Sequence, residues 1–244
     1  MKMDKITLPI VIGVDSERNP YSLDLAKYKS VLVAGMTGMG VNLVLDSAVK
    51  SLIENNNQSL IKLLLIGELF EGTIGDNNSY VPSLSNEQIS YPPVLRRSED
   101  IESAIKSLRM ELERRYALFR DFRAKNIDEH NALEEEVYKL PYIIVALSSF
   151  ERLEKSAVSE ILDIMLRNAA VGIYFLVGTQ LCSSISSRLI ADCNVKVCFR
   201  TTMASDSIKI IGRPDAVELQ RGEMLLKTNY GIDIFEKLNV SLPN

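Results

Sequence analysis

A glycine-rich stretch follows an apolar run near the start of the chain: Gly35, Gly38 and Gly40 precede Val41 and Asn42. In the Gly-x-x-x-x-Gly-Lys-Ser/Thr loop of nucleoside triphosphatases, glycines let backbone N–H groups approach the phosphates. The lysine neutralises the β- and γ-phosphate oxygens, and the hydroxyl holds Mg²⁺. Val41 and Asn42 occupy the positions of the lysine and the hydroxyl residue. The loop therefore keeps the glycines of a phosphate site and lacks its charge and its metal ligand.

Two interpretations of this loop stay open. In the first, the glycines serve only a tight strand-to-helix turn and bind nothing. In the second, backbone groups of Gly35, Thr37, Gly38 and Gly40, with the start of the following helix, bind a nucleotide weakly. The first is favoured, because glycines alone supply only part of phosphate recognition. We therefore expect no tightly bound cofactor and no metal site, with weak ATP binding as the alternative.

The loop requires a strand before it and a helix behind it. Val31–Ala34 is a continuous apolar run, and apolar residues recur at helical spacing between Asn42 and Glu54, which predicts both elements. Further strands are expected over 8–14, 21–25, 61–66, 140–147, 173–177, 195–199 and 224–227.

Helical patterns separate these strands. A long amphipathic helix is expected to follow Ser98, which serves as its capping residue. A second helix capped by Ser156 is expected to run towards Ala170. The segment Gly67–Pro93 is rich in Gly, Asn, Ser and Pro, which predicts an irregular surface excursion. Apolar strands alternating with helices predict an α/β fold, with a mostly parallel central sheet and helices on both faces.

The bulk composition limits the class of protein. The chain has 244 residues, 46% of them hydrophobic and 25% charged, which is typical of a globular protein. A net charge of −4 does not favour binding of the chain as a whole to nucleic acid. The chain contains no apolar stretch of about 20 residues that would span a membrane, and its start lacks the apolar core of a secretory signal. A cytoplasmic location is expected.

Three further features are interpreted without a catalytic role. The three cysteines lack a paired metal spacing, so buried thiols are expected. His130 is the only histidine and lies between Glu129 and Asn131, which predicts a solvated side chain and excludes a triad built on it. Arg114 and Arg115 belong to a basic helix, where a solvated face is expected and a subunit contact is the alternative.

Seven segments occur in this order from about Leu8 to Leu225: LPIVIG, DLAKY, VLVAGMTGMG, ERRYALF, LPYIIVALSSFERL, VGIYFLVGTQ and RGEML. In order and spacing this set resembles the motor domain of the FtsK/SpoIIIE family of bacterial DNA translocases. The resemblance implies a RecA-like P-loop NTPase fold that assembles as a ring around double-stranded DNA. On this basis residues 1–244 form a single motor domain. It comprises an N-terminal β extension over 1–27, a RecA-like core over 28–228 and a C-terminal tail over 229–244.

The chain departs from the family pattern at the catalytic carboxylates. In the family, the strand that matches Tyr142–Leu147 ends in Asp-Glu, the Asp organising Mg²⁺ and the Glu polarising the attacking water. Ser148 and Ser149 stand there in this chain. A serine hydroxyl carries no negative charge and cannot accept a proton from water near neutral pH, so both roles should lapse. We expect these serines to be satisfied by nearby backbone groups.

Other charged family positions also differ. Gly67-Glu68-Leu69 replaces Asp-Pro-Lys, and Leu181-Cys182 replaces Arg-Pro after the sensor strand. Ala169 replaces an Arg that in the family is thought to reach the neighbouring subunit's nucleotide, although Arg167 lies two residues earlier. Gln180 is retained at the sensor position and joins the loop residues as a candidate nucleotide contact.

The favoured function is therefore an FtsK/SpoIIIE-like motor homologue that has lost ATP hydrolysis and acts as a pseudo-ATPase assembly subunit. Its partners would be FtsK-like subunits in a homo- or hetero-oligomer, with double-stranded DNA as a further candidate. One alternative is an ATP-dependent DNA translocase in which Glu151 or Glu154 substitutes for the missing carboxylates. Another is an ATP-independent DNA-binding ring.

Overall fold

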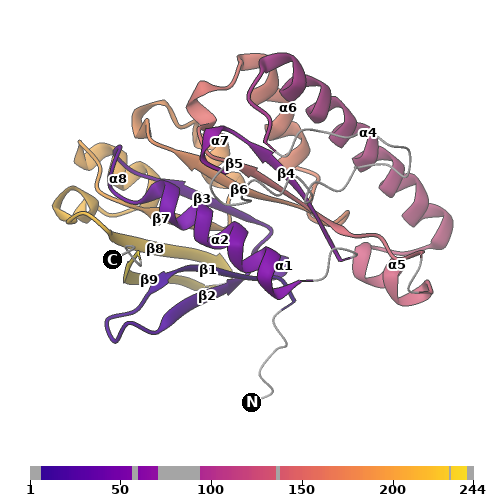
Figure 1. Ribbon diagram of the computed structural model, residues 1–244, viewed down its shortest axis with the longest axis horizontal. Coiled ribbons are helices and arrows are strands. Elements are labelled where there is room, and N and C mark those ends of the chain that lie inside the picture. Colours follow the sequence, from indigo (N-terminus) through magenta and orange to yellow (C-terminus); the bar gives the residue numbers. More distant parts are fainter. Residues whose placement is uncertain (1–6, 57–59, 71–93, 136–137, 231, 241–244) are drawn as a thin grey trace.

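The strands of the protein form one mixed sheet (Figure 1). The computed structural model describes residues 7–56, 60–70, 94–135, 138–230 and 232–240. Within these ranges nine strands are hydrogen-bonded in the order β2-β1-β9-β8-β7-β3-β6-β5-β4. Their bounds are β1 Pro9–Val14, β2 Pro20–Asp24, β3 Ser30–Ala34, β4 Ile61–Ile66, β5 Tyr142–Leu147, β6 Ile173–Thr179, β7 Val195–Cys198, β8 Glu223–Tyr230 and β9 Ile232–Asn239.

The parallel half of the sheet positions the glycine loop. β3 pairs in parallel with β6 on one side and with β7 on the other, and β5 and β4 continue the sheet beyond β6. The other half is antiparallel, since β8, β9, β1 and β2 pair in that direction. The α/β fold with a parallel core is confirmed, but the whole sheet is mixed rather than mostly parallel.

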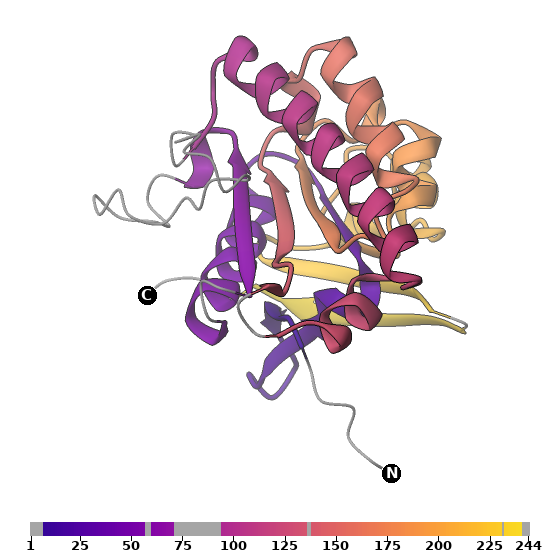
Figure 2. The ribbon, with the colours of Figure 1, turned by 90° about the vertical axis from the view of Figure 1, so that its right-hand side faces the viewer.

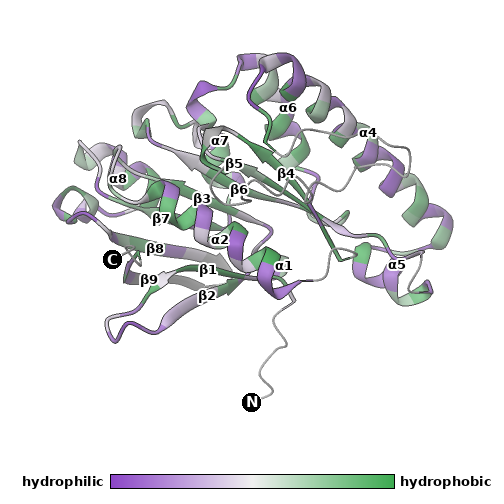
Figure 3. Ribbon diagram, viewed as in Figure 1, coloured by the Kyte–Doolittle hydropathy of each residue, from purple (hydrophilic) through white to green (hydrophobic). Residues whose placement is uncertain are grey.

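Helices cover both faces of the parallel half. Figure 2 shows α2 on one face and α4, α6 and α7 on the other. Figure 3 shows the strands between them as largely hydrophobic, with hydrophilic residues distributed over the helices. The helices are α1 Leu25–Tyr28, α2 Val41–Asn55, α4 Ser98–Phe122, α5 Ile127–Leu133, α6 Lys155–Met165, α7 Ser187–Asp192 and α8 Ala204–Ile211.

α2 forms directly behind the loop because its apolar residues recur on one face. Val41, Val44, Leu45, Val49 and Leu52 are buried against the sheet. Burial of each such side chain stabilises the fold by about 1.5–3 kcal/mol. Packing of this face therefore fixes where the N-terminus of α2 lies relative to the strand ends.

The two predicted serine caps are wrong. Ser98 is the first residue of α4, behind the N-cap Arg97, and Ser156 lies inside α6, behind the N-cap Glu154. Neither N-cap side chain accepts a hydrogen bond from its helix. The Ser156 hydroxyl instead donates to Glu102 Oε1 at 3.2 Å, linking α6 to α4.

Strands form near both ends of the described part of the chain. β1 and β2 occur where the N-terminal β extension was expected. Within the expected C-terminal tail over 229–244, β9 occupies Ile232–Asn239 and pairs antiparallel with β8 and with β1, which the sequence did not predict. Of the predicted excursion Gly67–Pro93, residues 71–93 lie outside the described residues, and Glu68–Phe70 forms a short 3₁₀ helix.

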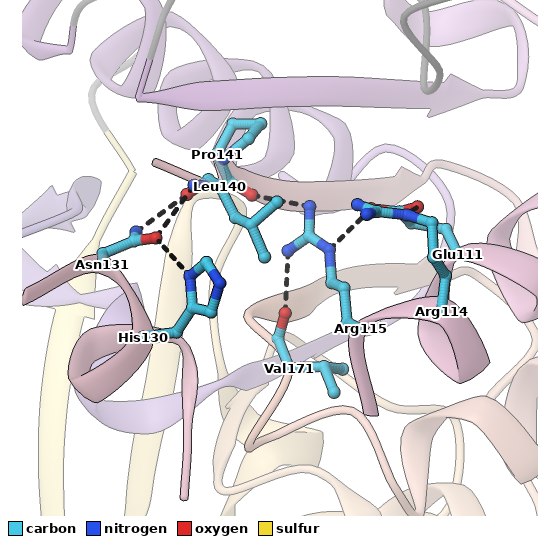
Figure 4. A network of polar contacts seen from close by, with 8 residues as sticks. All are labelled: Glu111, Arg114, Arg115, His130, Asn131, Leu140, Pro141 and Val171. Atoms are coloured by element: carbon cyan, nitrogen blue, oxygen red, sulfur yellow. Dashed lines mark hydrogen bonds and ion pairs between the residues drawn. The ribbon is translucent and has the colours of Figure 1, made fainter. Parts of the chain in front are cut away.

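Arg115 is buried, contrary to the solvated face expected for it. Its side chain is 1% exposed and donates to Glu111 Oε1 at 2.7 Å (Figure 4). It also donates to the carbonyl oxygens of Val171 and Pro141, each at 2.8 Å. Pro141 and Val171 lie just before β5 and β6, so this one guanidinium ties α4 to the starts of two core strands.

His130 is also buried rather than solvated, with 2% of its surface exposed. Its ring lies 5.3 Å from the Phe119 ring and 5.0 Å from the Phe122 ring, measured between centroids. Its Nδ1 faces Asn131 Oδ1 at 3.4 Å (Figure 4). The histidine therefore packs α5 against the end of α4.

Candidate functional site

The glycine loop lies at the carboxyl end of β3, in front of α2. Gly40 has a φ of +133°, and a Cβ added there would come within 2.6 Å of the Phe199 ring and 3.1 Å of a Val240 methyl group. A Cβ on Gly35 would collide with the Cβ of Phe199. Gly38 has a φ of +81° and faces open space. Tight packing thus explains why glycine is needed at positions 35 and 40, and the backbone conformation explains why it is favoured at position 38.

Neighbouring strands hold the backbone of the loop. Gly35 N–H donates to the Thr179 carbonyl at 3.3 Å, and Met36 N–H donates to the Arg200 carbonyl at 2.8 Å. Met39 O accepts from Gly222 N–H at 3.0 Å. In the described part of the chain, no acceptor is seen for the N–H groups at positions 37, 38 and 40. The loop therefore retains backbone donors suited to an anion.

The two positions after the loop carry no charge. Val41 is buried as the first residue of α2, and Asn42 follows it, half-buried. Asn42 Oδ1 accepts a hydrogen bond from Gln180 Nε2 at 3.2 Å. The structure thus brings together two of the residues singled out from the sequence, although they lie 138 positions apart.

The two serines that follow β5 differ in environment. Ser148 is buried, and its hydroxyl has no hydrogen-bond partner among the described residues, so the expectation of backbone partners is wrong. The hydroxyl instead lies against Gly67, where an added Cβ would collide with it. Ser149 is half-buried and lines a cavity of about 110 Å³ between the ends of β4 and β5 and the starts of α4 and α6.

Of the two candidate substitute carboxylates, only Glu151 contacts the site. Its Oε2 accepts from the backbone N–H of Gln180 at 3.4 Å. Glu154 is exposed and lines the cavity beside Ser149, and no loop residue from Gly35 to Asn42 is among the described residues of that lining. The structure therefore separates two glutamates that lie only three positions apart.

Two arginines near the loop were not picked out as site residues from the sequence. Arg200 follows β7, and its carbonyl accepts from Met36. Arg221 precedes Gly222, whose N–H donates to Met39. Both side chains are exposed. Only the RGEML segment signalled Arg221, and nothing in the local sequence signalled Arg200. Both lie near the loop because the adjacent strands β7 and β8 belong to the same sheet as β3.

The arginine nearest the family's intersubunit position is engaged within the chain. Arg167 binds both carboxylate oxygens of Glu113, at 2.6 and 3.1 Å. Its guanidinium carbon also lies 5.2 Å from the centre of the Tyr116 ring. The hydrogen bond to Glu113 raises the pKa of Arg167. These contacts hold Arg167 against α4.

Comparison with known proteins shows the family to which the chain belongs. The FtsK/SpoIIIE family profile matches residues 1–184, which is more than half of the chain. The chain belongs to the FtsK/SpoIIIE family. It is 30% identical over 238 residues to the DNA translocase SftA of Bacillus subtilis, covering 93% of this chain and 24% of that protein. It is 29% identical to the DNA translocase FtsK of Helicobacter pylori J99, covering 89% and 26%. The chain therefore spans about a quarter of the length of these relatives.

Solved structures confirm the RecA-like P-loop ATPase fold. The cytoplasmic domain of the type VII secretion ATPase EccC of Thermomonospora curvata has a TM-score of 0.78 and 19% identity, covering 96% of this chain and 28% of that one. The pCW3 conjugation coupling protein TcpA, solved with ATPγS, has a TM-score of 0.73 and 18% identity, covering 98% and 68%. At these identities the likeness shows the fold alone.

Among the described residues, no group of three or more His, Cys, Asp or Glu side chains is placed to hold a metal ion. No helix in the same ranges combines the length and the apolar character needed to cross a bilayer.

Proposed function

We propose that this chain is a non-hydrolysing motor domain of the FtsK/SpoIIIE family that acts by association with FtsK-like subunits. Within this proposal, residues 28–228 remain the RecA-like core of a single motor domain, and the location is cytoplasmic. Double-stranded DNA is proposed as a further partner, because the relatives SftA and FtsK are named DNA translocases.

One observation supports the loss of hydrolysis most directly: the position of the loop lysine is filled by Val41, a residue that is only 2% exposed. The metal-ligand position is filled by Asn42, which is already bonded to Gln180. The described donor set does not fit a magnesium–triphosphate, because Val41 offers no positive charge and the neutral amide oxygen of Asn42 already accepts from Gln180. Phosphoryl transfer depends on positioning and charge neutralisation, so losing these groups together should remove turnover.

The second candidate function is ATP-dependent translocation with Glu151 as the relocated carboxylate. The contact between Glu151 Oε2 and the Gln180 N–H favours it, since it brings a carboxylate to the candidate nucleotide contact. Backbone donors in the loop support residual ATP binding in either case. Without a lysine and a metal ligand, one carboxylate supplies only part of the catalytic requirement.

Turnover of Mg·ATP by the purified chain, with and without double-stranded DNA, tests the proposal. Wild type, Glu151→Gln and the matched control Glu154→Gln are expected to release phosphate at one common background rate. Release by wild type that Glu151→Gln abolishes and Glu154→Gln preserves would establish the second candidate instead.

Association is tested separately by light scattering and by mixing with a catalytically active FtsK-family motor domain. The proposal predicts a larger complex than the isolated chain. Recovery of monomers under all conditions would contradict it. DNA binding, if present, should weaken steeply with salt, as release of counterions from the phosphate backbone requires.

A further inference from the structure

We propose that Asn42 acts as a built-in substitute for a bound ligand. Its side-chain oxygen takes the Gln180 donor that faces the site, so that the ends of three core elements are held together without a nucleotide. This inference rests on the proposed function, because it describes how an unliganded site keeps its order.

The contacts involved form a short chain across the site. Asn42 is the second residue of α2, and its Oδ1 accepts from Gln180 Nε2 at 3.2 Å. Gln180 directly follows β6, and its backbone N–H donates to Glu151 Oε2 at 3.4 Å. Glu151 lies in the short 3₁₀ helix Phe150–Arg152 that follows β5. We call the Asn42–Gln180 hydrogen bond the amide bridge. The contact between Gln180 and Glu151 connects it to a third element, the short helix after β5.

The chemistry of the amide bridge explains why an asparagine serves this role. A carboxamide oxygen is a neutral acceptor that can take an N–H donor in place of a phosphate oxygen. Both side chains are half-buried, so an unpaired donor there would lose solvent contacts without compensation. Serine or threonine at position 42 has its oxygen one bond closer to the backbone, and would not span the same gap.

The amide bridge also lies in the way of a nucleotide. One N–H of the Gln180 side chain is already committed to Asn42, so an incoming phosphate must compete with a contact inside the chain. Breaking the bridge frees the Gln180 amide, and also loosens the end of β6 from the start of α2. Order at the site is then expected to depend on the bridge rather than on ligand.

A double-mutant cycle on the full chain tests this inference. Asn42→Ala alone is expected to lower Tm by about 1–6 °C, which corresponds to one hydrogen bond in a chain of this size. In the Gln180→Ala background the same change should lower Tm by less than half as much, because its partner is gone. Asn55→Ala is the matched control, since Asn55 lies on the same helix and bonds locally to the Ser51 carbonyl. Its effect should be equal in both backgrounds.

Hydrogen exchange supplies a second readout that folding defects do not mimic. Asn42→Ala should speed amide exchange around Gln180 while leaving the centre of β6 protected, and Asn42→Thr should do the same. Swapping the amides, as Asn42→Gln with Gln180→Asn, should restore part of the lost Tm. Additive Tm effects in the cycle, or unchanged exchange at Gln180, would overturn the inference. ATP turnover by wild type would overturn the proposed function without changing the Tm coupling between Asn42 and Gln180. Failure of the proposed function and failure of this inference are therefore distinguishable.

Discussion

Replacing Arg115 by alanine should be the most destabilising single change on α4. The guanidinium is 1% exposed and makes three contacts, one to Glu111 and one each to the carbonyl oxygens of Pro141 and Val171. Truncation leaves both carbonyls and one carboxylate oxygen without this donor. Because α4 covers one face of the sheet, the loss acts on the starts of β5 and β6 as well.

The expected magnitude follows from burial. Removing the buried guanidinium costs about 3–5 kcal/mol, because the carbonyl oxygens of Pro141 and Val171 stay desolvated without this donor and Glu111 is left with Arg114 alone. For a chain of 150–250 residues, each 1 kcal/mol lowers Tm by about 2–4 °C, so Arg115→Ala should lower it by about 6–20 °C. Arg114→Ala is the matched control, since Arg114 binds the same Glu111 from a side chain that is 53% exposed. An exposed pair is worth about 1 kcal/mol or less.

The difference between wild type and Arg115→Ala should also depend on pH. Burial alone would raise the pKa of Glu111, but the hydrogen bonds and charges of Arg114 and Arg115 outweigh it and lower the pKa below 4.5. A carboxylate with a lowered pKa stabilises the fold above its unfolded pKa, and this contribution is lost as pH falls through the folded value. The Tm difference should therefore shrink as pH is lowered from neutrality to below 4.5.

Thermal unfolding followed by circular dichroism, over a series of pH values, measures both effects. Equal Tm losses of a few degrees for Arg115→Ala and Arg114→Ala would refute the stabilising role of the buried Arg115 contacts. So would a Tm difference between wild type and Arg115→Ala that grows in acid.

Two further predictions concern the loop and the thiols. Gly38→Ala meets open space and should cost only the left-handed backbone conformation, about 1–2 kcal/mol, whereas Gly40→Ala also collides with Phe199 and should cost about 1–3 kcal/mol more. Urea unfolding midpoints measure the difference, and equal losses would be inconsistent with the packing. Burial raises the pKa of Cys182 to about 11 and that of Cys193 to about 12, so a disulfide reagent at pH 8 should label neither promptly and Cys182 first. Rapid labelling of Cys193 in the native protein would show that it is accessible.

Elements with continuous apolar character could be predicted from the sequence. Ile61–Ile66 was placed to the residue, and the strand expected over 140–147 differs from β5 only at its start. The antiparallel β9 was missed because Ile232–Asn239 gains its partners only by pairing back on β8, and a terminal stretch of mixed polarity gives no local sign of that. His130 was wrongly predicted to be solvated, because its polar sequence neighbours give no sign that its ring packs against Phe119 and Phe122.

The candidate site shows a similar division. The loop spacing identified Asn42, and the family resemblance identified Gln180, but their hydrogen bond depends on how α2 packs beside β6. Glu151 and Glu154 were equivalent candidates in the sequence. The short helix after β5 turns one towards Gln180, whereas the other lies at a separate cavity. Local spacing cannot encode that choice.

Val41 and Asn42 place no charge where a magnesium–triphosphate would need it. Calorimetric titration of the purified chain with ATP, in the presence and absence of Mg²⁺, tests it most directly. The predicted result is an affinity of about 1 mM or weaker that Mg²⁺ leaves unchanged. Binding at about 1 μM that tightens when Mg²⁺ is added would contradict it.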